Sequence, residues 1–472
     1  MDRDDGNSFH KVKGSEGHSY PRGYLDRREG VGFCHALEKA LIRAQIVFYP
    51  ETPIVKLLLD DGQVIGALGF DLATGGYRVF NSKVVILATG GLGQLFALTT
   101  NARSLTGDGY AMAFDAGAEL VDMEMVQFMP LSFPYPESWK GVFIGMSSLW
   151  GPDVRLYNGP GERYMGGYDP ERLEYATRDI AARANYTEIM EGRGTEHGAI
   201  VVDPTGNDPG LLSGFQKSLP HIYNRVRKIF GEDAANWKKT FEAIPSQHFF
   251  MGGVVVDEKC CTGVPGLFAV GEVCGGVHGA NRLSGTALAE IFVFGDLAGE
   301  NVTGWMKDHD LIPAREKEVR KEITRLDERF TACPKKGVRP FEAKRMIKDL
   351  MWRYLGPVRQ GGGIRKAISA IDYIRKEGLP QLCLGSNHFQ YNRERVELCE
   401  VTFMVKAAAM IALSALDREE SRGSHYRTDY PAPDDRRWLK NIVVAKGNDG
   451  EPAVSYKPAF RTGYSEKNAG CV

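Results

Sequence analysis

The sequence has no C-x-x-C pair. Its eight cysteines are scattered through 472 residues, at positions 34, 260, 261, 274, 333, 383, 399 and 471. Structural zinc sites and cysteine-held iron–sulfur clusters need ligands at short, regular spacings. We therefore expect neither, and we predict no metal site. The cysteines are interpreted as free, buried thiols of a reducing compartment.

The sequence also lacks a strong net charge and a long apolar run. The net charge of −1 gives no electrostatic reason to bind nucleic acid or an acidic membrane. The apolar run Met404 to Leu416 is too short to span a bilayer and contains Lys406. The acidic, polar start MDRDDGNSFH does not resemble a secretory signal. Hydrophobic residues make up 43% of the chain, as in soluble proteins, and its length allows two to four domains.

What the sequence does contain is a strand–loop–helix pattern at positions 248–299. A short apolar strand is predicted at Leu267 to Val270, followed by a loop of small residues. A helix that includes Ala287 is predicted next, with Ser284 or Thr286 as its N-cap. Such a junction presents free backbone N–H groups and the positive end of a helix dipole to an electron-rich ligand.

The other predicted elements alternate between strands and helices. Further strands are predicted at 45–49, 55–59, 64–70, 77–80, 83–88, 253–256, 442–444 and 453–456. Further helices are predicted at 31–44, 175–191, 214–230, 314–330, 341–354, 363–377 and 392–418. The continuous apolar run at 83–88 is typical of a strand buried on both faces.

Several motifs along the chain occur in one recognisable order. They are VVILATGG, TGDG and QF-x-P between Val84 and Pro130, the pair Arg178-Asp179, LFAVGE, HGANRL and a T-A-L-A-E helix within 248–299, and ESRGSHYR near the C-terminus. Together they resemble the flavoprotein subunits of succinate dehydrogenase and fumarate reductase, and L-aspartate oxidase. The resemblance implies an α/β fold, with a glutathione-reductase-like FAD/NAD(P)-binding domain, an α+β capping domain and a C-terminal helical domain.

One part of that fold is not found. A dinucleotide-binding flavoprotein is expected to open with a strand, G-x-G-x-x-G and a helix, and no such unit precedes residue 84. The predicted fold class therefore lacks the N-terminal ADP-binding βαβ unit; either the chain is truncated or that half comes from elsewhere. The expected domains are a partial FAD-binding domain at 1–125, a capping domain at 126–247, the return of the FAD-binding domain at 248–300, a helical domain at 301–430 and a C-terminal tail at 431–472.

The resemblance implies FAD as cofactor. The flavin ring gains negative charge on reduction, so a helix N-terminus aimed at it stabilises the reduced form. The segment Gly17 to Arg22 resembles the one that runs beside the flavin. The implied cofactor contacts are Gly90, Gly91, Asp108, Gly271, Glu272 and the backbone N–H groups of Ala287 and Leu288. Because Glu272 follows the end of a strand, a ligand role is favoured over a cap or a salt bridge.

The implied reaction moves a hydride between the flavin and a carbon next to a carboxylate, and a proton to or from the neighbouring carbon. It needs cations for the carboxylates and a proton carrier. Arg178 matches the family's proton-delivering arginine, and His248 and Arg282 match two carboxylate-binding residues. Arginine normally stays protonated, so this role requires a relay behind it. A surface ion pair is the alternative interpretation of Arg178-Asp179.

The chain departs from the family at four of these positions. Met129 stands where the family has a substrate-binding histidine. Met146, Ser147 and Trp150 align with the threonine, glutamate and arginine of the family's T-E-x-x-R-G loop. The last three replacements add apolar bulk, with the indole of Trp150 among them. A doubly charged substrate would lose part of its clamp, and an unpaired buried carboxylate is costly. We expect a substrate that is less charged or bulkier than a C4 dicarboxylate.

Two alternatives remain open beside this FAD-dependent oxidoreductase. The chain could keep the family's own succinate dehydrogenase or fumarate reductase activity, or it could be a non-catalytic or electron-relay subunit. The expected partners are a small carboxylate substrate and an iron–sulfur or other electron-transfer subunit, with no nucleic acid and no direct membrane span. The expected location is cytoplasmic, or peripheral to the inner face of the membrane through a partner.

Overall fold

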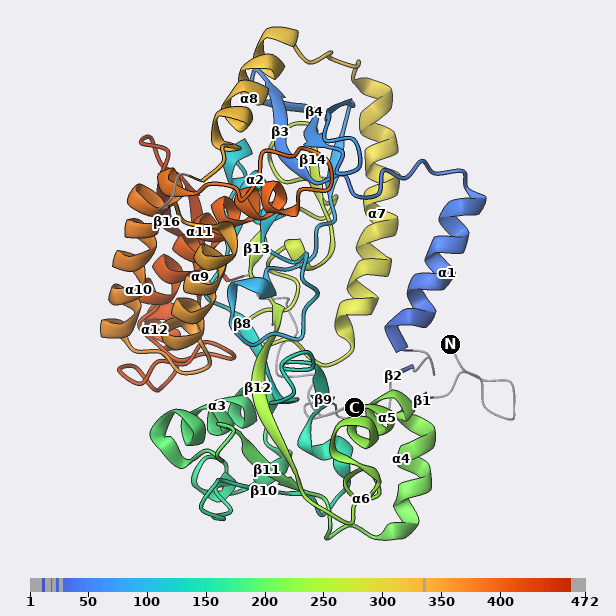
Figure 1. Ribbon diagram of the computed structural model, residues 1–472, viewed down its shortest axis with the longest axis vertical. Helices are drawn as coiled ribbons and strands as arrows, with labels where there is room; N and C mark the ends of the chain where they lie inside the picture. Colours follow the sequence, from blue (N-terminus) through green and yellow to red (C-terminus); the bar gives the residue numbers. More distant parts are fainter. Residues whose placement is uncertain (1–10, 13–17, 19–22, 25–28, 334–336, 460–472) are drawn as a thin grey trace.

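The computed structural model describes residues 11–12, 18, 23–24, 29–333 and 337–459. Its central connection is a parallel pair of strands, β6 (Val85–Leu87) and β14 (Leu267–Ala269), which joins two distant segments of the chain. The 23-residue helix α7 (Thr286–Asp308) follows β14 and runs along this part of the molecule (Figure 1). The predicted strand–loop–helix pattern is therefore present.

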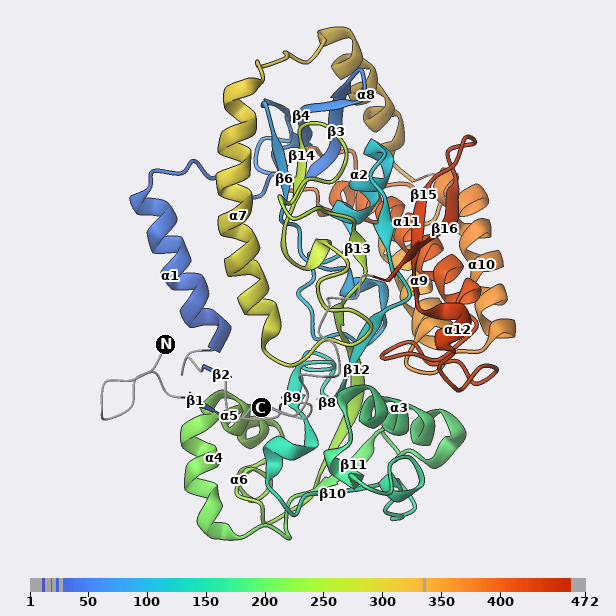
Figure 2. The same cartoon turned by 180° about the vertical axis from the view of Figure 1, so that it is seen from behind.

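An antiparallel three-stranded sheet lies next to this connection. Its strands are β3 (Ile54–Asp60), β4 (Gln63–Phe70) and β5 (Tyr77–Asn81), in the order β3-β4-β5. Asp61 and Gly62 both have positive φ angles (47° and 79°), as a two-residue hairpin turn requires. Helix α1 (Glu29–Arg43) precedes the sheet and stands beside α7 in both views (Figures 1 and 2).

The segment between β6 and β14 folds largely into a second lobe. Its antiparallel sheet has the order β10-β11-β12-β8-β9, and its two longest strands run from this lobe toward β14 (Figure 1). The strands are β8 (Val126–Ser132), β9 (Phe143–Gly145), β10 (Arg155–Tyr157), β11 (Ile200–Asp203) and β12 (Phe241–Phe250). The helices are α3 (Arg178–Glu188), α4 (Leu212–Ser218), α5 (Pro220–Phe230) and α6 (Glu232–Ala235).

Helices form the side of the molecule opposite α7 (Figure 2). They are α8 (Glu316–Arg329), α9 (Pro340–Leu355), α10 (Gly361–Tyr373), α11 (Arg393–Asp417) and α12 (Asp435–Trp438). Of the helices described, α11 alone has the length and apolar composition to cross a membrane, and 72% of its apolar window is buried inside the protein. It packs against α2 (Asp108–Ala116), α9 and α10, so we interpret α11 as the core helix of this region.

The predicted C-terminal strands are present and are part of a larger sheet. They are β15 (Lys440–Lys446) and β16 (Pro452–Pro458). Strand β15 pairs with β7 (Leu120–Val121), which in turn pairs with β13 (Gly253–Val254). The end of the described chain is thereby joined to the segment that leads into β14.

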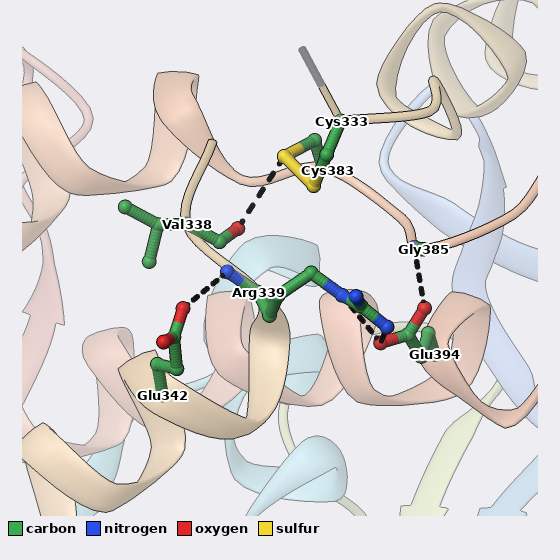
Figure 3. Close-up of a disulfide and its surroundings, with 7 residues drawn as sticks. All are labelled: Cys333, Val338, Arg339, Glu342, Cys383, Gly385 and Glu394. Atoms are coloured by element: carbon green, nitrogen blue, oxygen red, sulfur yellow. Dashed lines mark hydrogen bonds and ion pairs between the residues drawn. A yellow bond between two sulfur atoms is a disulfide. The ribbon is translucent and has the colours of Figure 1, made fainter. Parts of the chain in front are cut away.

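The prediction of free cysteines is wrong for one pair. Cys333 and Cys383 form a disulfide between the segment after α8 and the segment before α11 (Figure 3). Backbone hydrogen bonds hold the two segments together, with Cys333 N donating to Leu384 O at 2.8 Å and Cys383 N donating to Val338 O at 3.1 Å. Sequence spacing carries no signal for this bond because the partners lie 50 residues apart. The free cysteines among the described residues are Cys34, Cys260, Cys261, Cys274 and Cys399.

Three predictions of local structure are also wrong. Residues 45–49 form no strand, because no neighbouring strand pairs with them, and the side chain of Val47 is 71% exposed. The helix predicted at 214–230 is two helices that meet at Pro220, whose ring starts α5 and cannot continue α4. Strand β6 is not buried on both faces, since Ile86 is 42% exposed.

Candidate functional site

The start of α7 is open to a ligand. Its N-cap is Gly285, with φ 84°, so the prediction of Ser284 or Thr286 at this position is wrong. No described side chain caps the helix, and the Thr286 hydroxyl donates to Leu283 O instead, at 2.7 Å. The N–H groups of the first turn, including those of Ala287 and Leu288, therefore have no partner within the helix. They present a partial positive charge at this end.

Glu272 lies close to this helix start, at the end of β14. Its carboxylate accepts a hydrogen bond from Phe250 N (3.0 Å), and its carbonyl accepts one from the Tyr110 hydroxyl (2.6 Å). Burial raises the pKa of Glu272 to about 7, although Arg282 nearby lowers it. A Cβ atom at Gly91 would overlap the carboxyl group, so the glycine is required for this approach.

The glycine-rich loop that leads into α2 lies beside the glycine-rich loop that follows β6. Asp108 is the first residue of α2 and follows the N-cap residue Gly107, which has a φ of 84°. Burial raises the pKa of Asp108 to about 6. Gly90 and Gly271, at the ends of β6 and β14, have φ angles of 68° and 73°, which residues other than glycine rarely adopt. The two parallel strands thus end in loops that can approach a ligand closely.

Three buried polar atoms in this region have no hydrogen-bond partner among the described residues. They are Oγ1 of Thr89, Nε of Arg282 and Nδ1 of His18. The other ring nitrogen of His18 lies 2.9 Å from Ser284 O, which places this residue of the segment predicted to run beside the flavin at the start of α7. Unpaired buried polar groups are costly, so these atoms fit a bound molecule that carries hydrogen-bonding groups. The residues present fit the flavin part of FAD.

Arg178 begins α3 in the second lobe and is buried. One of its Nη atoms donates to Oε1 of Gln127 (2.7 Å), and the other lies 3.5 Å from the sulfur of Met146. Gln127 in turn donates to Asn281 Oδ1 (2.9 Å) and to Arg282 O (2.8 Å). Asn281 donates to Asp179 Oδ1 (2.8 Å). Arg178-Asp179 is therefore part of a chain that reaches the loop before α7, and is not a surface ion pair.

His248 lies at an irregularity of β12. The register against β8 shifts between Gln247 and Phe249, so His248 is an extra residue of the kind that forms a bulge. Its ring stacks near Phe143, with centroids 6.1 Å apart, and its Nδ1 lies 2.8 Å from the Thr100 hydroxyl. Burial, followed by the charges of Arg178 and Arg282, holds the pKa of His248 well below its usual value. The imidazole is neutral there.

Arg282 completes the group, from the loop before α7. Its guanidinium lies 4.3 Å from the centroid of the Phe249 ring, and burial lowers its pKa to about 10. Arg178, His248 and Arg282 thus come from α3, β12 and the loop before α7. Their mutual electrostatic influence and the chain through Gln127 place them in one site, and their roles in binding and catalysis remain predictions.

The four positions that depart from the family differ in their surroundings. Met146 contacts Arg178, as expected of the loop that holds it. Met129 lies two residues beyond Gln127 on β8 and is buried, and Ser147 is buried with an unpartnered hydroxyl. The expectation that Trp150 adds bulk to this pocket is wrong. Its fully buried ring packs on Phe215 and Phe241 in the core of the second lobe, at centroid distances of 4.9 and 4.7 Å.

Sequence reasoning missed three residues of the site: Thr100, Gln127 and Asn281. Gln127 and Asn281 belong to motifs that were recognised, QF-x-P and HGANRL, so their position beside predicted site residues was a signal. Thr100 precedes the TGDG loop and carries no pattern of its own. His278 forms a buried pair with Glu290 at 2.7 Å.

The ESRGSHYR stretch makes hydrogen bonds to neighbouring parts of the chain. Within it, Ser424 N donates to Ala280 O (2.9 Å), beside the loop that carries Arg282. Arg427 donates to three carbonyl oxygens at the end of α11, and to Asp429. These contacts join the helical region to the loop before α7, as packing residues do.

Comparison with known proteins gives a consistent result. A family model described as an FAD binding domain matches residues 4–288, and one described as fumarate reductase flavoprotein C-term matches residues 344–466. The chain is 38% identical over 422 residues to a subunit of the CoM/CoB fumarate reductase of Methanothermobacter marburgensis, covering 89% of this chain and 74% of that protein. It is 33% identical over 461 residues to the fumarate reductase flavoprotein subunit of Mycobacterium tuberculosis, covering 92% and 76%.

Solved structures agree with these matches. The FrdA chain of E. coli quinol fumarate reductase superposes with a TM-score of 0.88 at 27% identity, over 98% of this chain and 80% of that chain. Mycobacterium smegmatis Sdh1 in complex with UQ1 gives a TM-score of 0.84 at 28% identity, over 98% and 78%. The predicted α/β fold with FAD-binding and C-terminal helical parts is confirmed, and so is FAD as the cofactor.

Proposed function

This chain belongs to the family of fumarate reductase and succinate dehydrogenase flavoprotein subunits and is an FAD-dependent oxidoreductase, and from that premise we propose the reaction at its site. The proposed reaction is the reduction of a carbon–carbon double bond next to a carboxylate, or its reverse. The observation that supports it is the meeting of Arg178, His248 and Arg282 beside the open start of α7. Bound FAD supplies the hydride acceptor or donor.

The residues of the chain have distinct proposed roles. Arg282, with its permanent charge and unpaired Nε, binds a substrate carboxylate. Neutral His248 donates a hydrogen bond to it. Arg178 holds the proton that is exchanged with the substrate carbon, and the hydrogen bond to Gln127 fixes its guanidinium. Glu272 is proposed to contact the hydroxyl groups of the cofactor, and the N–H groups of Ala287 and Leu288 stabilise the negative charge of the reduced ring.

For the substrate, we propose an acid that is less charged or bulkier than a C4 dicarboxylate. The thioethers of Met129 and Met146 occupy positions where the family has a histidine and a threonine, and Ser147 replaces a glutamate. The substitutions remove hydrogen-bond donors and a relay group and leave apolar surface. A second carboxylate in this part of the site would lose charge-assisted hydrogen bonds, which contribute about 1.5–3 kcal/mol each.

The second candidate is the reduction of fumarate or the oxidation of succinate. Two observations favour it: Arg178 and Arg282 together carry enough charge for two carboxylates, and the relatives at 38% and 33% identity are named fumarate reductases. An assay of the FAD-loaded protein with an artificial electron carrier separates the candidates. Succinate or fumarate turnover at ordinary enzyme rates supports the second. Turnover confined to monocarboxylic or bulkier enoic acids supports the first.

We also propose an electron-transfer partner. The relatives are named as subunits, and among the described residues no group of three His, Cys, Asp or Glu side chains could hold a metal ion. Electrons that leave the flavin would therefore pass to an iron–sulfur or other redox subunit, which could also hold this chain at a membrane surface. Copurification of a tagged chain with a protein that shows iron–sulfur absorbance tests this proposal.

A further inference from the structure

The side chain of Thr100 holds one ring nitrogen of His248. Its Oγ1 lies 2.8 Å from His248 Nδ1. Nε2 is therefore the ring nitrogen left to meet a ligand. A hydrogen bond of this kind decides which nitrogen of a neutral histidine carries the proton.

The surroundings of the Thr100 hydroxyl favour one direction for this bond. Among the described residues, the other acceptor near Oγ1 is Gln247 O, which lies 3.4 Å away and already accepts the backbone N–H of Thr100 at 2.9 Å. A contact of 3.4 Å is at the weak end of hydrogen-bond geometry. Nδ1 of His248 is therefore the better placed acceptor for the hydroxyl hydrogen.

The charge of His248 then fixes the position of the remaining proton. Burial and the neighbouring cations Arg178 and Arg282 keep the ring neutral, so it carries one N–H only. If Nδ1 accepts from Thr100, that N–H is at Nε2. We propose that Thr100 is a positioning residue that holds His248 as the Nε2–H tautomer, so that this N–H donates to the substrate carboxylate. The proposal rests on the carboxylate-binding role proposed above for His248.

Other contacts prevent the ring from turning away. Asn101 Nδ2 donates to the backbone carbonyl of His248 at 3.0 Å, and the Phe143 ring is inclined by only 19° to the imidazole. The loop that carries Thr100 is bound to β12 through Gln247 N, which donates to Leu98 O at 2.8 Å. Thr100 therefore acts from a fixed position.

Three variants test this proposal. Thr100→Val keeps the shape of the side chain and removes the hydroxyl, and Thr100→Ser restores it. Thr99→Val is the matched control, because the Thr99 hydroxyl donates to Oε1 of Gln247 (2.7 Å) and does not touch His248. The first measurement is nitrogen NMR of histidine-labelled protein without substrate, with the His248 signals assigned from His248→Gln. The second is the affinity of the FAD-loaded protein for propionate, a stable monocarboxylate, followed by flavin absorbance.

The expected wild-type spectrum shows a protonated Nε2 and an unprotonated Nδ1 for His248, unchanged in Thr99→Val and Thr100→Ser. In Thr100→Val the two tautomers mix, and the affinity for propionate falls about tenfold, as expected for the loss of one well-oriented hydrogen bond. A wild-type His248 protonated at Nδ1, or a Thr100→Val spectrum identical to the wild type, would overturn the proposal. If the tautomer changes as expected but propionate binding does not, the carboxylate-binding role of His248 fails instead.

Discussion

At the scale of single residues, the Gln127 amide joins the two arginines of the site. It accepts a hydrogen bond from Arg178, which is buried, and donates one to the backbone carbonyl of Arg282. We propose that this bridge fixes the Arg178 guanidinium in the position from which it exchanges a proton with the substrate.

We predict that Arg178→Gln abolishes turnover without loss of FAD. Removing a positioned proton carrier typically costs a factor of about 10² to 10⁴ in rate. Arg183→Gln is the control, since Arg183 lies on the same helix with its guanidinium 4.0 Å from the Tyr426 ring, outside the site. Steady-state rates and bound-flavin absorbance are measured for both. Equal rates for Arg178→Gln and the wild type would remove Arg178 from the mechanism.

We predict a pH-dependent stability from Glu272. Its pKa is about 7 in the folded protein against 4.5 for an ordinary glutamate, chiefly because of burial. Between these values the folded state binds more protons than the unfolded state, so the free energy of unfolding falls as the pH rises. A shift of this size corresponds to about 3 kcal/mol. The contribution of Glu272 to the free energy of unfolding is fully lost once the pH exceeds the folded-state pKa.

Glu272→Gln removes this contribution and leaves the others in place. Asp108 also has a raised pKa and titrates in the same direction, but it is present in both proteins. Urea unfolding of the wild type and the variant at about pH 5 and about pH 7.5 isolates the difference. If the free energy of unfolding changes equally with pH in both proteins, Glu272 does not titrate in this range.

At the scale of elements, the helices were largely predictable and the strand pairing was not. Helices α8 to α11 lie within a few residues of the ranges predicted from the sequence, whereas for α7 only the start was predicted. The parallel pairing of β6 with β14 and the addition of β15 to β7 depend on contacts between distant segments, for which a single sequence gives no signal. The same reason hid the disulfide between Cys333 and Cys383.

We predict that Gly91→Ala weakens FAD binding. The new methyl group would overlap the Glu272 carboxyl at the ends of β6 and β14, so this carboxyl must turn away from the position proposed for cofactor contact. Gly214→Ala is the control, because Gly214 lies in α4 with open space around its Cα, where alanine favours the helix by about 1 kcal/mol. FAD affinity is measured by absorbance after gel filtration. An unchanged FAD affinity in Gly91→Ala would contradict the close approach of the Glu272 carboxyl to Gly91.

We predict that the disulfide stabilises the join between α8 and α11. Cys383→Ser should lower the free energy of unfolding by about 2–4 kcal/mol, because the bond closes a long loop in the unfolded chain. Cys260→Ser, at a free buried thiol, is the control for cysteine removal itself. Urea unfolding in the absence and presence of a dithiol reductant tests this. If the reductant leaves the wild type unchanged, the thiols are not bonded in solution.

At the scale of the whole molecule, the site lies where three parts of the chain meet. Arg178 comes from the lobe of β8 to β12, Arg282 from the loop before α7, and Ser424 links that loop to the helical region. The residues of this site were predicted from their motifs, because each motif has a recognisable sequence pattern and the motifs follow one another in the family's order. Gln127 links Arg178 to the loop before α7, an arrangement that only the folded chain shows.

The central claim is that the flavin ring lies at the start of α7 with Arg178, His248 and Arg282 beside it. The most direct measurement is the absorption spectrum of the full chain with FAD, recorded while propionate, a stable monocarboxylate, is added to the wild type and to Arg282→Gln. The account predicts a retained yellow flavin in both, with a propionate-dependent spectral shift in the wild type that is lost in Arg282→Gln. A chain that retains no flavin, or a shift that is equal in the two proteins, would contradict it.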